Sequence, residues 1–131
     1  MIVVDASALL EFLVPTATAP AGLELLLLSS GETLHAPQLL DVEVAHVLRR
    51  HTGRGVIDAE RGRLALIDLA NLPLQRYPHV RLLPRIWELR DNLTACDAAY
   101  VALAEALDAP LLTRDRRLAG TAGHHARIEL V

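Results

Sequence analysis

The chain has 131 residues, a formal net charge of −3 and a hydrophobic content of 52%, as expected of one folded domain. The net charge argues against a protein that holds nucleic acid by bulk charge, and the absence of lysine excludes a lysine nucleophile. A single cysteine excludes an intrachain disulfide and a cysteine metal cluster. The sequence contains no basic signal-peptide pattern and no apolar run near the roughly 20 residues of a membrane span. We therefore expect a cytoplasmic protein without membrane contact.

The first predicted element is the apolar run Ile2–Val4, a strand buried on both faces and therefore central in a parallel sheet. Apolar residues at helical spacing and capping residues predict helices over 6–14, 16–30, 38–51, 59–72, 79–90 and 95–107. Further short strands are expected over 33–36, 74–77, 110–113 and 126–131, with a helical turn over 114–118.

The predicted strands alternate with helices, and the connections between them are too long for hairpins. This order is typical of an α/β fold with a mostly parallel sheet covered by helices on both faces. We find no repeat or linker, and we expect a single domain over residues 1–131.

Three acidic residues stand where predicted strands end or helices begin. Asp5 follows the first strand directly, and Asp115 follows the strand 110–113 by two residues, so both are expected at the carboxyl edge of the sheet. Either could simply cap the next helix. Asp97 fits the third position of a capping box begun by Thr94, which would by itself account for an acid there.

Glu43 is an acid on an apolar helical face. It lies within the helix 38–51, one turn after Leu39 and one turn before Val47. A carboxylate on such a face is costly unless it is paired or bound to a metal, although Glu43 could also lie at the edge of the stripe and face water. The neighbouring Asp41 points away from this face and is expected to be solvated.

Four acids at one sheet edge would repel one another, by about 4 kcal/mol for each pair 4 Å apart at an effective dielectric constant of 20. Either their pKa values rise or a cation neutralises them. An all-oxygen cluster suits Mg²⁺ or Mn²⁺, which activate water for attack at phosphorus. Ser7 and Thr113 could orient that water or a phosphate, or they could cap helices. The six histidines do not form a convincing zinc site.

Arginines gather beside two of the acids. Arg114, Arg116 and Arg117 surround Asp115, and Arg49 and Arg50 end the helix that carries Glu43. They could belong to solvated faces or could contact the phosphates of RNA, which would let an acidic protein bind RNA locally. Similarly, the leucine-rich stretches 23–28 and 64–72 could form an apolar surface for a partner or pack in the core.

Four segments of the chain each contain one of these acids, and they are VVDASAL (3–9), PQLLDVEV (37–44), TACDAAYVALA (94–104) and LLTRDRRL (111–118). In sequence and in order they resemble the signature blocks of PIN-domain proteins, and most closely those of the VapC-type toxins of toxin–antitoxin pairs. The resemblance covers the whole chain. It implies a three-layer α/β/α fold with a central, mostly parallel sheet and the activity of a Mg²⁺- or Mn²⁺-dependent endoribonuclease toxin.

By motif, the resemblance assigns metal binding and catalysis to Asp5, Glu43, Asp97 and Asp115, and auxiliary hydroxyl positions to Ser7 and Thr113. It also implies a homodimer, a cognate antitoxin that covers the active-site groove, and contact with DNA only through that antitoxin. Two residues depart from the family pattern. Cys96 stands where members often have an aromatic residue, and Arg117 leaves no further acid close behind Asp115.

Two other functions compete with this interpretation. A receiver domain has a similar size and an acidic Mg²⁺ pocket, but it uses a lysine that this chain lacks. A PIN-like fold could also serve as a catalytically silent RNA- or protein-binding module, although the presence of all four acids speaks against a loss of catalysis. A metal-dependent cleavage assay distinguishes a silent module from a nuclease.

Overall fold

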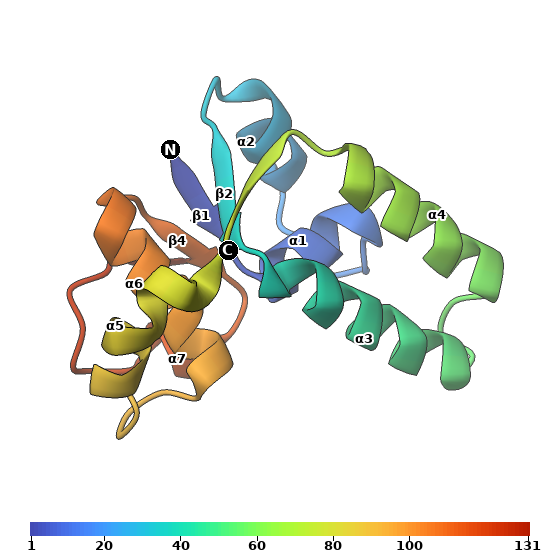
Figure 1. Ribbon diagram of the computed structural model, residues 1–131. Coiled ribbons are helices and arrows are strands. Elements are labelled where there is room, and N and C mark those ends of the chain that lie inside the picture. Colours follow the sequence, from blue (N-terminus) through green and yellow to red (C-terminus); the bar gives the residue numbers. More distant parts are fainter.

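The computed structural model describes the backbone of residues 1–131 and every side chain except that of Leu25. Its centre is a sheet of five parallel strands in the order β3-β2-β1-β4-β5 (Figure 1). The strands are β1 (Ile2–Val4), β2 (Leu34–Pro37), β3 (Leu74–Tyr77), β4 (Leu111–Thr113) and β5 (Ile128–Leu130). The predicted central position of the first strand is confirmed, and all three of its residues are buried.

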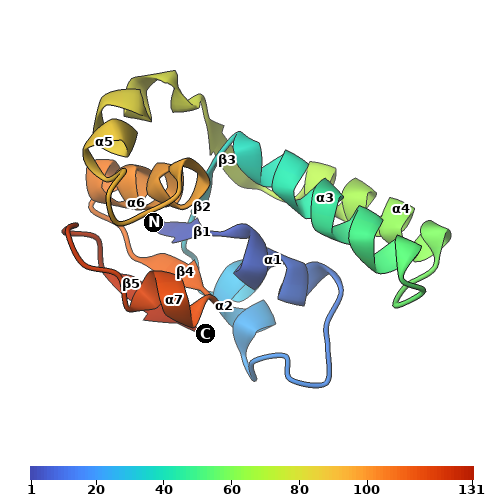
Figure 2. The same ribbon diagram turned by 90° about the horizontal axis from the view of Figure 1, so that it is seen from below.

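Helices connect the strands and cover both faces of the sheet. They are α1 (Ala6–Leu13), α2 (Leu23–Ser29), α3 (Leu39–Gly53), α4 (Ala59–Asn71), the 3-10 helix η1 (His79–Leu82), α5 (Leu83–Glu88), α6 (Ala95–Leu107) and α7 (Arg116–Ala119). The connections between the parallel strands place α1 and α2 on one face of the sheet and α5 and α6 on the other (Figure 2). The predicted three-layer α/β/α fold is confirmed.

The core is aliphatic, as the composition predicts. Val3 and Val4 of the central strand have no exposed surface, and they pack between Leu9 of α1 and Val101 of α6, which are equally buried. Burial of this kind stabilises a fold by about 25 cal/mol for each Å² of apolar surface removed from water. Among the described residues, no helix has the length and apolar character that crossing a membrane requires.

Two predicted helices differ from the structure because prolines interrupt them. The helix expected over 16–30 begins only at Leu23, since Pro20 lacks a backbone N–H and Gly22 has a left-handed backbone (φ 83°). The helix expected over 79–90 is split into η1 and α5, because Pro84 cannot donate the amide hydrogen bond that a continuous helix needs.

Helices α3 and α4 run side by side as an antiparallel pair that projects beyond the sheet (Figures 1 and 2). Asp58 caps α4 as predicted, because its side chain accepts the N–H of Arg61 at 2.7 Å. Asp41, expected to be solvated, instead accepts a hydrogen bond from Arg76 Nε at 2.7 Å and ties α3 to β3. That expectation was wrong because β2, which leads into α3, pairs with β3 and brings Arg76 next to the start of the helix.

Candidate functional site

The candidate site lies at the point where the strand order of the sheet reverses, between β1 and β4. From β1 the chain proceeds to β2 on one side, whereas β4 leads to β5 on the other side. Open α/β sheets leave a crevice at the carboxyl ends of the two strands that flank such a point. Asp5 follows β1 and Asp115 lies two residues beyond β4, so the fold brings both acids to this crevice as expected.

The crevice is an open cleft of about 710 Å³, and all four predicted acids line it. Asp5 and Asp115 come from the sheet edge, Glu43 from α3 and Asp97 from the first turn of α6. The rest of the lining is mixed in character. It consists of Ala6, Ser7, Leu10, Leu39, Val42, His46, Val47, Arg50, Cys96 and Tyr100.

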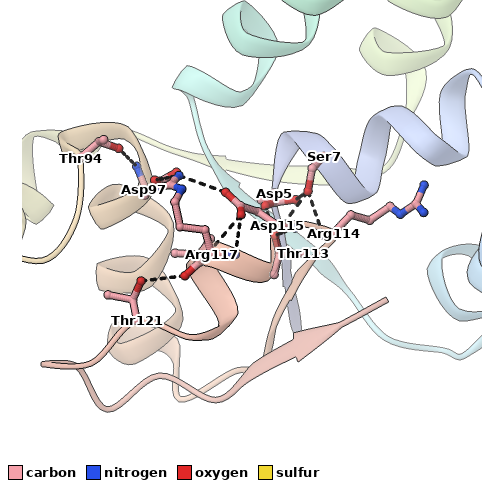
Figure 3. Close-up of polar contacts among 10 residues, drawn as sticks. Asp5, Ser7, Thr94, Asp97, Thr113, Arg114, Asp115, Arg117 and Thr121 are labelled. Atoms are coloured by element: carbon pink, nitrogen blue, oxygen red, sulfur yellow. Dashed lines mark hydrogen bonds and ion pairs between the residues drawn. The ribbon is translucent and has the colours of Figure 1, made fainter.

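Asp5 is buried, with 6% of its surface exposed, and three donors hold its carboxylate. Its Oδ1 accepts the N–H of Ala8 at 2.9 Å and the hydroxyl of Ser7 at 2.7 Å, and Oδ2 accepts the hydroxyl of Thr113 (Figure 3). The Ala8 bond makes Asp5 the N-cap of α1. Asp5 therefore caps α1 with one carboxylate oxygen and also lines the cleft.

Burial raises the pKa of Asp5, and the three hydrogen bonds oppose that rise. The two hydroxyls also bind the segment that follows β4. Thr113 Oγ1 accepts the N–H of Asp115 at 2.9 Å, and Ser7 Oγ accepts the N–H of Arg114 at 2.9 Å. Ser7 and Thr113 thus connect Asp5 to the chain beside Asp115, and neither caps a helix.

Glu43 is half-buried on α3, and the hydroxyl of Tyr100 donates a hydrogen bond to its Oε2. Burial raises the pKa of Glu43, and the negative charges of Asp97 and Asp5 raise it further, whereas the bond from Tyr100 lowers it. The apolar helical face that singled out Glu43 in the sequence therefore turns toward the cleft. The carboxylates of Asp97 and Asp5 thus repel that of Glu43, as expected of acids gathered at one edge of the sheet.

Asp97 and Asp115 share a counter-ion. Arg117 Nη2 donates to Asp97 Oδ2 at 2.8 Å and to Asp115 Oδ2 at 3.0 Å (Figure 3). The other oxygen of Asp115 caps α7, accepting the N–H groups of Arg117 at 2.8 Å and Leu118 at 3.3 Å. Thr94 accepts the N–H of Asp97 at 3.2 Å, as a capping box predicts, yet the Asp97 side chain is paired with Arg117.

The arginines considered for RNA contact have different environments. Arg50 lines the cleft, while Arg49 and Arg116 are exposed elsewhere. Arg114 points away from Arg117 in Figure 3, and its guanidinium is bound to Glu11 and, at 3.1 Å, to the carbonyl of Thr18.

Glu11 and Tyr100 are site neighbours that the sequence interpretation did not identify. Glu11 is 7% exposed and lies one turn after Ser7 on α1, so its helical spacing from Ser7 could have indicated it. Tyr100 lies three residues after Asp97 on α6 and therefore on the same face. The position of the Tyr100 hydroxyl, one helical turn from the candidate acid Asp97, could have indicated its place at the site.

The donor set fits a hard divalent cation in its chemistry, because all four acidic side chains offer oxygen atoms. Among the described residues, no three His, Cys, Asp or Glu side chains are grouped closely enough to hold one ion.

Comparisons with known proteins identify the family of the chain. The family model for the PIN domain matches residues 2–124. Ribonuclease VapC12 of Mycobacterium tuberculosis is 44% identical over 131 residues, covering 100% of this chain and 99% of that protein. Ribonuclease VapC9 of the same organism is 47% identical over 131 residues, covering 100% and 98%.

A solved structure has the same fold at low sequence identity. It is VapBC2 from Rickettsia felis, bound to a DNA fragment from its promoter, with a TM-score of 0.69 and 14% identity over 99% of this chain and 98% of that one. Full-length similarity to two VapC ribonucleases and the match of the family model lead to one conclusion. The chain belongs to the PIN-domain family.

Proposed function

We propose that this protein is the toxin of a VapBC-type toxin–antitoxin pair and acts as a Mg²⁺- or Mn²⁺-dependent endoribonuclease. The observation that carries the proposal is the cleft lined by Asp5, Glu43, Asp97 and Asp115 at the switch point of the sheet. The names of the full-length relatives, which are ribonucleases, support the same activity.

In the proposed mechanism Asp5, Asp97 and Asp115 would hold the cation, and Glu43 would bind it or orient the attacking water. A cation held there would supply Lewis acidity and activate water for hydrolysis of an RNA phosphodiester, with no covalent enzyme intermediate. Thr113 and Ser7 keep the Asp5 carboxylate in one orientation. Tyr100 does the same for Glu43.

Positive charge beside the acids would attract the substrate. Arg50 lies on the rim of the cleft, where its guanidinium can contact a phosphate next to the scissile bond. The protein has a formal net charge of −3, so binding would depend on such local contacts rather than on its overall charge.

Two partners belong to the proposal. The relative VapBC2 is a complex, which supports an antitoxin for this chain, and DNA would be contacted only through that antitoxin. A homodimer is supported by apolar side chains with large exposed fractions, 72% for Val42 and 68% each for Val80 and Trp87. The leucine-rich stretches are divided, since Leu27 and Leu69 are buried in the core whereas Leu28 and Leu64 are exposed and accessible to a partner.

The direct test compares Asp5→Asn with Asp91→Asn in an RNA cleavage assay with purified protein and added Mn²⁺. Asp91 is an exposed turn residue and provides a matched change of charge. We expect Asp5→Asn to lose activity on the order of 100-fold and Asp91→Asn to retain it. Equal cleavage by Asp5→Asn and the wild type would remove Asp5 from the mechanism. RNA binding without cleavage by the wild type would instead favour the silent binding module.

A further inference from the structure

Arg117 joins two of the four cleft acids. Its Nη2 atom lies 2.8 Å from Asp97 Oδ2 and 3.0 Å from Asp115 Oδ2, so a single nitrogen bridges two carboxylates (Figure 3). Asp97 lies in α6, and Asp115 lies 18 residues later in the chain, at the start of α7. The guanidinium thus provides the positive charge that two facing carboxylates need.

The backbone leaves these two oxygens free for Arg117. Asp115 uses Oδ1 to accept the N–H groups that begin α7, and its Oδ2 contacts Arg117. Asp97 donates its backbone N–H to the hydroxyl of Thr94 and does not use its carboxylate in that cap. A divalent cation held by Asp97 and Asp115 would need the same two oxygens.

We infer that Arg117 competes with the divalent cation, occupying its place between Asp97 and Asp115 until the cation displaces it. This inference rests on the proposed metal-dependent function and adds a residue that controls occupancy of the site. The Arg117 side chain is 62% exposed, so it can swing into water without disturbing the core. When it leaves, its guanidinium remains tethered next to Asp97 and Asp115, two acids of the cleft, where it can pair with a phosphate of the bound RNA.

The size of the competition follows from the fraction of molecules in which the bridge is open. An exposed ion pair is weak, and two pairs to one guanidinium would close the site in about 70 to 90% of molecules. The apparent association constant for the metal equals the intrinsic constant multiplied by the fraction of molecules in which the bridge is open. Removal of the guanidinium should therefore tighten cation binding about three- to tenfold. The difference should shrink in 1 M salt, which screens exposed ion pairs.

The test measures Mn²⁺ binding directly, from the electron paramagnetic resonance signal of free Mn²⁺, for the wild type, Arg117→Ala and Arg116→Ala. Arg116 lies on the same helix and forms no ion pair with any side chain that the structure describes, so its removal controls for net charge. We expect Arg117→Ala to bind Mn²⁺ about three- to tenfold more tightly than Arg116→Ala at low salt.

A second readout follows thermal unfolding without RNA. Without metal, Arg117→Ala should melt below Arg116→Ala, because the two carboxylates then repel each other. Added Mn²⁺ should raise its melting temperature by more than that of either other protein.

Two results would overturn the inference, and they differ in meaning. If the wild type binds Mn²⁺ and both variants bind it equally well, Arg117 does not compete and the proposed nuclease function is unaffected. If none of the three proteins binds Mn²⁺, the metal-dependent function itself fails, and the inference fails with it.

Discussion

Glu11 and Arg114, which are 103 residues apart in the chain, form an ion pair that joins α1 to the segment between β4 and α7. Glu11 is 7% exposed and also accepts the N–H and the hydroxyl of Thr16. Arg114 in turn donates its backbone N–H to Ser7, whose hydroxyl binds Asp5. The pair therefore braces the loop that follows α1 against the chain segment that carries Asp115.

We predict that Glu11→Gln lowers the free energy of unfolding by about 1 to 3 kcal/mol, because it leaves the Arg114 guanidinium with an uncharged partner. Burial raises the pKa of Glu11, but the bonds from Thr16 and Arg114 outweigh burial and hold it below its ordinary value. A depressed folded-state pKa contributes stability above the unfolded-state value of 4.5, which is lost as the pH falls through the folded-state value.

Urea unfolding at pH 7 and at progressively lower pH measures this contribution. The difference between Glu11→Gln and the wild type should be largest at pH 7 and should disappear in acid. Glu60→Gln is the matched control, because it breaks an ion pair with Arg63 in which both side chains are more than half exposed. A gap of the same size for Glu60→Gln would show that burial of Glu11 does not matter.

Glu43 shows the opposite dependence of stability on pH. Burial raises its pKa, and the charges of Asp97 and Asp5 add to the rise. A raised folded-state pKa contributes stability below the unfolded-state value of 4.5, and that contribution is lost as the pH rises through the folded-state value. At neutral pH the ionised Glu43 therefore destabilises the metal-free protein.

We predict that Glu43→Gln is more stable than the wild type at pH 7 in EDTA. We also predict that the variant has no nuclease activity. The gain should stay below about 1 kcal/mol, because the carboxylate is half-buried and water screens part of the repulsion. The amide oxygen can still accept the hydroxyl of Tyr100, so packing is kept. Thermal unfolding at pH 7 and at pH 4 tests this, since the gain should fade at the lower pH. A variant less stable than the wild type at pH 7 would contradict the electrostatic account.

Much of the site could be predicted because its residues coincide with strong local signals. Asp5 and Asp115 each follow a buried strand, and the parallel order of the sheet brings their positions together. Glu43 was identifiable because an acid on an apolar face of α3 needs a compensating environment. These signals depend on short stretches of sequence, and they place the carboxylates without any knowledge of contacts.

The side-chain partners could not be predicted, because they depend on packing between distant segments. Arg114 and Arg117 are three residues apart with the same side chain. One binds Glu11 on α1, and the other bridges Asp97 and Asp115. Asp41 was misjudged for the same reason, since Arg76 of β3 reaches it only in the folded sheet. Proline content was readable in the sequence, but its effect on the helices expected over 16–30 and 79–90 was underestimated.

The last prediction separates two adjacent arginines on α3. Arg50 lines the cleft, whereas Arg49 is exposed and is not part of its lining. If Arg50 contacts a phosphate, Arg50→Ala should weaken RNA binding about fivefold to tenfold in the background of the inactive Asp5→Asn variant, while Arg49→Ala should have a smaller effect. The slope of log affinity against log salt should fall by about 0.7 for Arg50→Ala, the value for one contact to a single strand. Equal slopes for the two variants would mean that neither arginine has a specific phosphate contact and that both act only through net charge.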